Sequence, residues 1–215
     1  MRPDLDQRER AELSDLLDDL GPDQPTLCEG WTTSAMAAHL VVRERQPLAM
    51  PGILVGGRFE ATTERMMHRE LERHGYHGTV ERVRSGPPRG PLSFAPVRSR
   101  VNLFEMTVHH EDVRRANGGE PRTDRPDLDD VVWGSLGSAM RLFLLRGRVR
   151  SLRVELHRPD GATHTAGPDS GPKVVLSGPP VECLLYLQGR KGPARVALSG
   201  DDAAIQQFRA ATFAI

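Results

Sequence analysis

Apolar residues recur every three or four positions through the first two-thirds of the chain. The first such stretch runs from about Asp4 to Leu20 and is followed by Gly21 and Pro22, residues that end helices. Its apolar positions are Leu5, Leu13, Leu16, Leu17 and Leu20. This spacing predicts an amphipathic helix that buries one face.

Several further stretches repeat this pattern between turn-forming segments. The first of these further predicted helices has Thr32 or Thr33 as its N-cap and is ended by Pro47 and Pro51. The second runs from about Phe59 to His74, and a shorter piece at 79–84 follows a break at Gly75. Two more run from about Pro96 to Ala116 and from about Leu128 to Leu145. A proline-rich loop at 85–91 and the glycine pair after Asn117 separate the later helices. Helices joined by modest loops predict a four-helix bundle domain over residues 1–147.

From Gly147 onward the pattern changes to alternation of apolar and polar residues. Ser151–His157 reads as a half-buried strand, and the turn residues at 159–161 predict a hairpin to the next strand. We expect His157 and His164 to face each other across this hairpin as surface side chains. Further strands are predicted at 163–166, 173–177 and 194–199, and helices at 179–188 and from Asp201. Residues 148–215 are therefore expected to form a small α+β domain, which gives the chain a mixed α and α/β fold.

Composition narrows the functional classes. The 215 residues carry 29 basic and 29 acidic side chains, so the formal net charge is zero. No overall positive charge therefore favours a nucleic acid or an anionic membrane as partner. No apolar run approaches the roughly 20 residues that span a bilayer, and the amino terminus lacks the apolar core of a signal peptide. The two cysteines, Cys28 and Cys183, fit no CxxC pattern. We expect a reduced, cytoplasmic protein, either monomeric or a homodimer, whose metal ligands are histidine and carboxylate.

The helix predicted around residue 105 carries the most informative chemistry. Glu105 and His109 are four positions apart and lie on one helix face, where they can bind one divalent cation if a third ligand comes from another segment. His39 is the candidate for that ligand, because its neighbours at helical spacing are apolar. Three protein ligands leave a coordination position open. Two interpretations without a metal stay open: Glu105 and His109 could be an exposed helix pair, and His39 could be a packed core residue. His110 is an alternative to His109 as the ligand, and it projects about 100° further round the helix.

Other side chains near these positions allow two interpretations each. Asp112 either accepts a hydrogen bond from the His109 ring or forms an ion pair with Arg115 or Arg43. Arg43, one turn beyond His39, either faces solvent or points to the open position and binds an anionic substrate. Cys28 is expected to be a small buried residue in a turn in preference to a fourth ligand.

Two segments resemble the DinB-like metal-binding bundles, in particular the branch that contains mycothiol-dependent maleylpyruvate isomerase. Leu27–Leu40 is similar to that family's element C-x-x-W-T-x-x-x-x-x-x-H-L, and Phe104–Arg115 is similar to its second metal helix, in which a Glu replaces the first His of HxxxH. The resemblance covers roughly residues 4–147, the tail is similar to the isomerase's small carboxy-terminal domain, and an actinobacterial subgroup is most similar. It implies His39, Glu105 and His109 as metal ligands.

The resemblance also implies a function. It suggests a divalent metal, expected to be zinc, and mycothiol as the low-molecular-weight thiol that attacks a small electrophile, either as an isomerase or as an S-transferase. Arg190, with Arg195 as competitor, is expected to be the arginine of the small domain that reaches the site. Two alternatives stay open: a non-catalytic metal-binding or regulatory module, and a metal-assisted hydrolase that would need a further carboxylate such as Glu111.

Overall fold

The computed structural model describes residues 5–45, 60–87 and 96–213, with the side chains of Glu60 and of 96–101 left aside. Its contacts divide the chain into two compact units, and the boundary lies between Glu120 and Pro121. Within the described residues, no helix combines the length and the apolar character that a membrane span requires.

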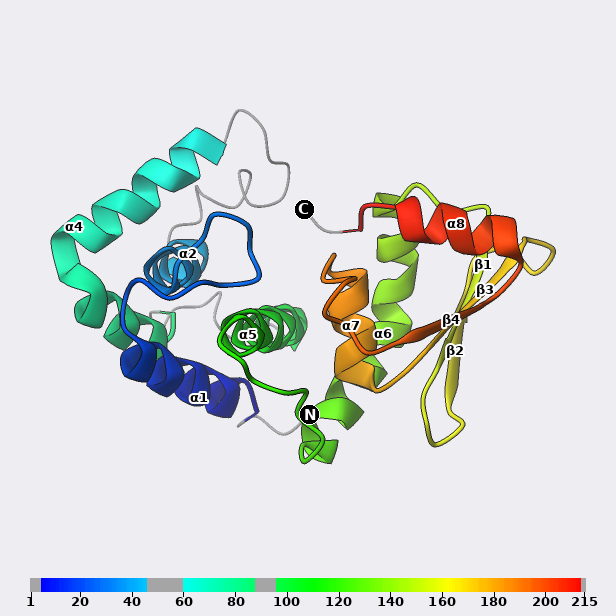
Figure 1. Cartoon of the computed structure of the whole chain (residues 1–215), viewed down its shortest axis with the longest axis horizontal. Coiled ribbons are helices and arrows are strands. Elements are labelled where there is room, and N and C mark those ends of the chain that lie inside the picture. The colour runs from blue at the N-terminus through cyan, green and yellow to red at the C-terminus, as the bar shows by residue number, and fades with distance from the viewer. Residues whose placement is uncertain (1–4, 46–59, 88–95, 214–215) are drawn as a thin grey trace. The chain divides into compact units, whose positions relative to one another are not determined.

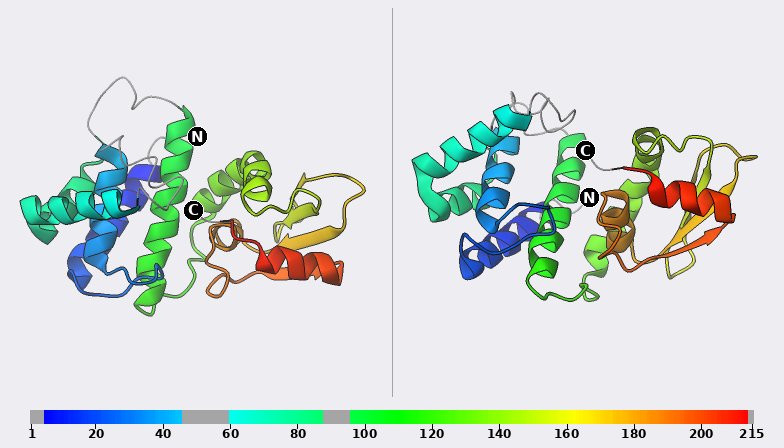
Figure 2. Two further views of the ribbon diagram at one scale, coloured as in Figure 1. Left: turned by 90° about the horizontal axis from the view of Figure 1, so that it is seen from above. Right: turned by 45° about the horizontal axis from the view of Figure 1, so that its top comes forward.

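The first unit is a bundle of helices (Figure 1). Its helices are α1 (Leu5–Leu20), α2 (Thr33–Arg45), α4 (Glu60–Arg84) and α5 (Pro96–Ala116). In the described part of the chain these match the helices predicted from apolar spacing. The predicted stops at Pro47 and Pro51 and part of the predicted 85–91 loop lie outside the described residues. Figure 2 shows α2 and α5 lying side by side, the arrangement on which the candidate site depends.

Apolar side chains from all four helices form the core of this unit. The fully buried members include Leu13, Leu17, Met36, Leu40, Val80, Val83, Met106 and Val113. Leu13 and Leu17 of α1 are one turn apart, as are Met36 and Leu40 of α2, so one stripe of each helix meets the same interior. The spacing that predicted the helices thus also determines their inward faces.

Helix α4 bends at Gly75, as the sequence predicted. Gly75 has φ 64° and ψ 178°, so the helical backbone is interrupted at that residue. A positive φ is easily adopted only by glycine, because other residues carry a Cβ that crowds the backbone. The bend lets one helix contact both α2 and α1.

A buried ion pair connects three helices of the bundle. The Arg10 guanidinium of α1 binds both carboxylate oxygens of Glu44 on α2 and also donates to the Val83 carbonyl of α4, at 2.8 Å. The two side chains are only 6% and 2% exposed. Since each charge is removed from water, each depends on the other for compensation.

Replacing Arg10 by alanine should therefore destabilise the bundle strongly. The Glu44 carboxylate would stay buried without its partner, at a cost of about 3–5 kcal/mol in the free energy of unfolding. Urea denaturation followed by circular dichroism measures this change. Arg8→Ala on the same helix is the matched control: its pair with Glu12 is 52% and 40% exposed, and its loss should cost less than about 0.5 kcal/mol. Equal effects of the two substitutions would contradict the assignment.

The second unit contains a four-stranded mixed sheet and three helices within the described residues. These are α6 (Pro126–Arg146), β1 (Arg153–His157), β2 (Thr163–Ala166), β3 (Lys173–Ser177), α7 (Pro180–Leu187), β4 (Ala197–Gly200) and α8 (Asp202–Ala210). The strand order is β2-β1-β3-β4, with β1 and β3 parallel and the outer pairs antiparallel. Val154 and Leu156 of β1 are buried, as the alternation predicted. The order of strands and helices in the tail is confirmed.

Helix α6 belongs to this second unit by its contacts, which are with α7 and β2. The predicted domain boundary after Gly147 differs from this division. An apolar repeat reveals that a segment is helical, but it carries no information about which neighbour covers its apolar face.

The expectation that His157 and His164 face each other is wrong. In the β1–β2 register His157 pairs with Thr163, and His164 pairs with Leu156. The His164 ring instead stacks on Trp133 of α6, with 4.4 Å between the centroids, and its Nε2 lies 3.0 Å from the Trp133 carbonyl oxygen. The hairpin register is offset by one residue from the expected one, which turns His164 toward the helix.

Candidate metal centre

His39, Glu105 and His109 converge in the first unit. One potential ligand atom from each lies within 4.8 Å of the others. The His109 Nε2 atom is 3.4 Å from Glu105 Oε2, and the rings of His39 and His109 meet edge to face with 5.1 Å between centroids. The i, i+4 pair on α5 and the single histidine on α2 are thus brought together as the sequence suggested.

The packing of α2 explains why His39 is directed to this place. Met36 and Leu40, on either side of it, are fully buried in the bundle core, and His39 itself is buried. The Trp31 ring lies against His39 with 4.9 Å between centroids. Trp31 therefore packs directly on the candidate ligand.

Asp112 takes the first of its two expected roles. Its Oδ2 atom is 2.9 Å from His109 Nδ1, and the carboxylate is completely buried. Of the two arginines named as its alternative partners, Arg115 binds Glu111 at 2.6 Å and Arg43 approaches Glu105. An Nδ1–H donated to a carboxylate fixes the orientation of the ring and leaves Nε2 to face Glu105.

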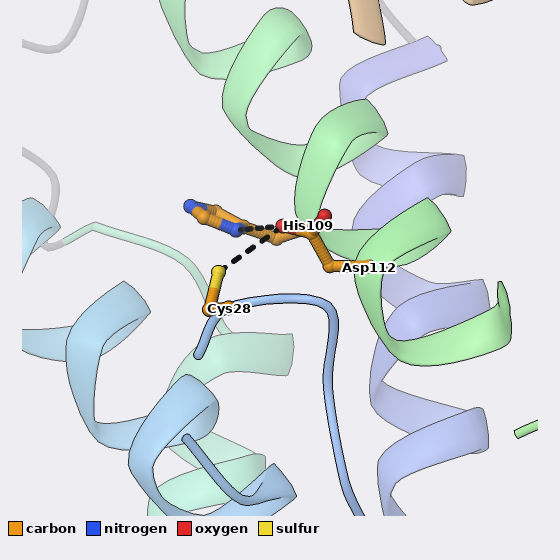
Figure 3. A group of neighbouring side chains, drawn as sticks. All are labelled: Cys28, His109 and Asp112. Atoms are coloured by element: carbon orange, nitrogen blue, oxygen red, sulfur yellow. Dashed lines mark hydrogen bonds and ion pairs between the residues drawn. The ribbon is translucent and has the colours of Figure 1, made fainter. Parts of the chain in front are cut away.

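Cys28 was expected to be a small buried residue in a turn, but it lies close to this centre. Its Sγ atom is 3.4 Å from Asp112 Oδ2 (Figure 3). The loop between α1 and α2 is held against α5, since the Leu27 N–H donates to the Asp112 carbonyl at 3.1 Å and the Asn117 side chain donates to the Pro25 carbonyl at 3.0 Å. Sequence spacing could not reveal this contact, because the two residues are far apart in the chain.

Arg43 is buried beside Glu105, so the interpretation as a solvent-facing residue is wrong. Its side chain is 6% exposed, its Nε is 3.4 Å from Glu105 Oε2, and its Nη1 donates to Asn102 Oδ1 at 3.1 Å. A guanidinium in this position adds a positive charge next to the candidate ligands. It can balance the Glu105 carboxylate and attract an anionic ligand.

These neighbours shift the pKa values of both α5 residues of the triad. Burial would raise the pKa of Glu105, but the hydrogen bond with His109 and the charge of Arg43 hold it at about 2. Burial would lower the pKa of His109, yet Asp112, Cys28 and Glu105 raise it well above 6.5. By linkage, His109 stabilises the fold below pH 6.5 and this contribution is lost as the pH rises through its raised pKa. Glu105 contributes above pH 4.5, and its contribution is lost as the pH falls to about 2.

His110 belongs to a different group on the other side of α5. Its Nδ1 is 3.2 Å from Glu9 Oε2 on α1, and both side chains are buried. Together with Glu12 they form another set of three closely spaced potential ligands, which no sequence pattern predicted. Glu9 and Glu12 are three positions apart on one helix, but nothing in the sequence links them to His110. The competition between His109 and His110 is thus resolved by geometry in favour of His109 as the neighbour of His39.

The arginines expected from the small domain lie in the second unit. Arg190 follows α7, and its Nη1 donates to the Gln188 carbonyl at 2.6 Å. The Arg195 backbone N–H donates to Glu182 at 2.7 Å. The role of Arg190 toward the metal centre stays a prediction.

The donor set fits a divalent transition metal. Two imidazoles and one carboxylate, two of them deeply buried, match the three-ligand sets that bind catalytic zinc. Both histidines must be neutral to bind a cation, and the His109 ring already has a carboxylate at its opposite nitrogen, as metal-binding histidines usually do.

Comparison with known proteins supports the fold. No protein-family model and no curated protein matches the sequence. Solved structures that are similar include a crystal structure of the mycothiol-dependent maleylpyruvate isomerase, with a TM-score of 0.58, and one of a histidine-to-alanine mutant of it, with a TM-score of 0.61. Each is 17% identical, and the match covers 93% of this chain and 92% of the other. The fold implied by the resemblance is confirmed, and at this identity the likeness is one of fold.

We expect cation binding at this centre to release a proton and to weaken as the pH falls. The pKa of His109 is raised well above 6.5, so a cation that binds Nε2 must compete with a proton more strongly than at an ordinary histidine. Below that pKa the apparent affinity should fall about tenfold per pH unit for one displaced proton. Titration of chelator-treated protein with Zn²⁺ in weak buffer, followed with a pH indicator, measures the release.

Two substitutions make this test specific. Asp112→Asn removes the group that most raises the pKa of His109, so it should reduce proton release at neutral pH. His68→Gln, at a histidine that is 74% exposed, should leave proton release unchanged. An affinity that stays constant between about pH 6 and about pH 8 would show that His109 does not take part.

Proposed function

We propose that this protein is a metal-dependent, thiol-using enzyme, an isomerase or S-transferase that acts on a small electrophile. The observation that carries the proposal is the three-donor set of His39, Glu105 and His109 on adjacent helices. It is supported by the fold, which is that of structures described as mycothiol-dependent maleylpyruvate isomerase. Mycothiol is accordingly the proposed thiol, and zinc the proposed metal.

The donor set suits zinc because it combines two imidazoles with one carboxylate and leaves one coordination position for an exogenous ligand. A zinc ion held there would supply Lewis acidity that lowers the pKa of a thiol bound beside it. This explains why a reaction of this class needs no protein base at the thiol. The protein groups around the triad can then serve to orient ligands and to balance charge.

Asp112 is the first of these groups. By accepting a hydrogen bond at His109 Nδ1 it keeps Nε2 directed toward Glu105 and His39. Because Asp112 is completely buried, its charge is not screened by water, and the ring cannot rotate without breaking the hydrogen bond. Asp112 is therefore a positioning residue in this proposal.

Arg43 is the second group, and it defines the substrate class. Its guanidinium lies beside Glu105, so an anionic thiol or an electrophile that bears a carboxylate gains a favourable charge there. The proposed partners are thus a small thiol and a small anionic electrophile.

The proposed reaction is addition of the thiolate sulfur to an electrophilic carbon. Addition to a carbon–carbon double bond converts it to a single bond, about which the adduct can rotate. Expulsion of the same thiolate then restores the double bond in the other geometry, and the net reaction is cis–trans isomerisation. If the adduct is released instead, a proton is taken up and the net reaction is thiol transfer.

The surroundings of Glu111 favour thiol chemistry over hydrolysis. A hydrolase would need a carboxylate beyond the three ligands to accept a proton from water. Glu111 is completely buried and binds Arg114 and Arg115 on its own helix, at 3.1 and 2.6 Å. It is engaged in these ion pairs and is poorly suited to act as a general base at the triad.

Removing two ligands should abolish both metal content and thiol binding. We expect His39→Ala/His109→Ala to lose the metal found by elemental analysis of the purified protein. Isothermal titration of the wild type with mycothiol should give binding that a chelator abolishes. His68→Ala/His77→Ala is the matched control, since it removes two exposed histidines and should change neither measurement.

The outcomes separate the candidate functions. Metal that is fully retained in the ligand double variant would refute the triad. Metal that depends on the triad without any thiol binding would favour a non-catalytic metal-binding module or a hydrolase over the proposed enzyme.

Substitution of Arg43 should affect anionic ligands selectively. Arg43→Met keeps most of the length of the side chain but removes its charge, so it should weaken binding of a carboxylate-bearing electrophile by about tenfold or more. Binding of its methyl ester, which lacks the charge, should change little. Arg43→Lys should restore part of the affinity, and an equal loss for acid and ester would assign Arg43 a purely structural role.

A further inference from the structure

His109 takes part in two donor sets, one at each ring nitrogen. At Nε2 it meets Glu105, at 3.4 Å, and His39 lies near. At Nδ1 it meets Asp112 Oδ2, at 2.9 Å, and the same oxygen is 3.4 Å from Cys28 Sγ. Cys28, His109 and Asp112 form a separate group whose ligand atoms lie within 4.8 Å of one another (Figure 3).

The second donor set is fixed by the surrounding structure. His109 and Asp112 are buried, and they are one turn apart on α5. Cys28 belongs to a loop whose backbone bonds to the Asp112 carbonyl through Leu27, and its own N–H is bonded to Thr26 Oγ1 at 3.2 Å. The Cys28 side chain is partly accessible, so a small cation can reach the group from solvent.

The arrangement is not that of a cysteine nucleophile with its base. In such a triad the thiol and the carboxylate bind opposite nitrogens of the imidazole, so that the carboxylate orients the ring while the other nitrogen takes the thiol proton. Here the thiol and the Nδ1 atom both meet the same carboxylate oxygen. Three donors that converge on one point are suited to hold a cation.

We propose that Cys28, His109 and Asp112 bind a thiophilic divalent cation such as Cd²⁺ or Zn²⁺. Thiolate is the soft ligand that selects such ions, and the carboxylate adds a second negative charge. Binding converts the Cys28 thiol to a thiolate, whose proton is released to solvent, and it displaces the proton from Nδ1, so that the ring keeps one proton, on Nε2.

The two donor sets exclude each other. A neutral imidazole has one lone pair available, so a cation at Nδ1 leaves Nε2 protonated and unable to bind a second cation. A thiophilic cation at Cys28 therefore removes His109 from the first set. In this way the second site would act as an inhibitory site for the proposed enzyme.

Titration with Cd²⁺, followed by ultraviolet absorption, tests the proposal. A cadmium–thiolate bond produces a charge-transfer band, whereas the histidines and glutamate of the first set produce none. The titration is made with the full-length His39→Ala/Glu105→Gln variant, in which the first set is reduced to His109. We expect a saturable charge-transfer band in this variant and its loss when Cys28→Ser is added.

Cys183 provides the matched control. It is the other cysteine of the chain and lies buried in the second unit, so Cys183→Ser in the same background should retain the band. A band that survives Cys28→Ser, or that disappears with Cys183→Ser, overturns the proposal. Cadmium binding without any band in the background variant overturns it as well.

A second measurement uses the wild-type chain and does not depend on the folding of any variant. Cd²⁺ should slow alkylation of Cys28 by iodoacetamide, measured by peptide mass spectrometry, and leave alkylation of Cys183 unchanged. Unchanged alkylation of Cys28 at saturating Cd²⁺ overturns the proposal. In the His39→Ala/Glu105→Gln background the first set is reduced to His109 and contains no sulfur, so the absorption result is independent of the metal content and thiol binding that test the proposed function.

Discussion

The hydrogen bond between His109 and Asp112 determines what the rest of the candidate site can do. It joins a ring and a carboxylate that are both buried, at 2.9 Å, and it is the main interaction that raises the pKa of His109 against the effect of burial. Because it occupies Nδ1, only Nε2 can face His39 and Glu105. The loop that carries Cys28 is held to Asp112 by a backbone hydrogen bond from Leu27, so Asp112 also positions the second donor set.

Burial of such groups costs free energy that the surrounding helices must offset. Three consecutive residues of α5 illustrate how this is achieved: His109 meets Asp112, His110 meets Glu9 of α1, and Glu111 meets two arginines of its own helix. Successive residues of a helix are about 100° apart, so these three neighbouring side chains point in different directions and each meets a different set of partners. The Arg10–Glu44 pair applies the same principle between helices. The apolar core holds the bundle together, and the two pairs that join different helices, His110–Glu9 and Arg10–Glu44, limit the register in which α1 meets α5 and α2.

Sequence patterns predicted most of the fold because apolar periodicity reflects the local environment of each segment. The bend at Gly75 and the strand at residues 153–157 are examples, since glycine and alternation are local signals. The i, i+4 spacing of Glu105 and His109 is likewise a local signal, because it places both side chains on one face of a helix. Contacts between segments that are far apart in the sequence could not be predicted in this way. The approach of Cys28 to Asp112, the burial of Arg43 and the contacts of α6 all depend on which helix faces meet, and the hairpin register depends on a shift of a single residue.

Each unit contains one of the two tryptophans of the chain, and each tryptophan ring lies against a histidine. Trp31 contacts His39 in the bundle, with 4.9 Å between centroids, and Trp133 stacks on His164 in the second unit, with 4.4 Å. Indole emission is sensitive to the charge and to the metal ligation of a ring so near. Each unit thus contains one intrinsic fluorophore that responds to its neighbouring histidine. Substitution of either tryptophan by phenylalanine would restrict the fluorescence signal to the other unit.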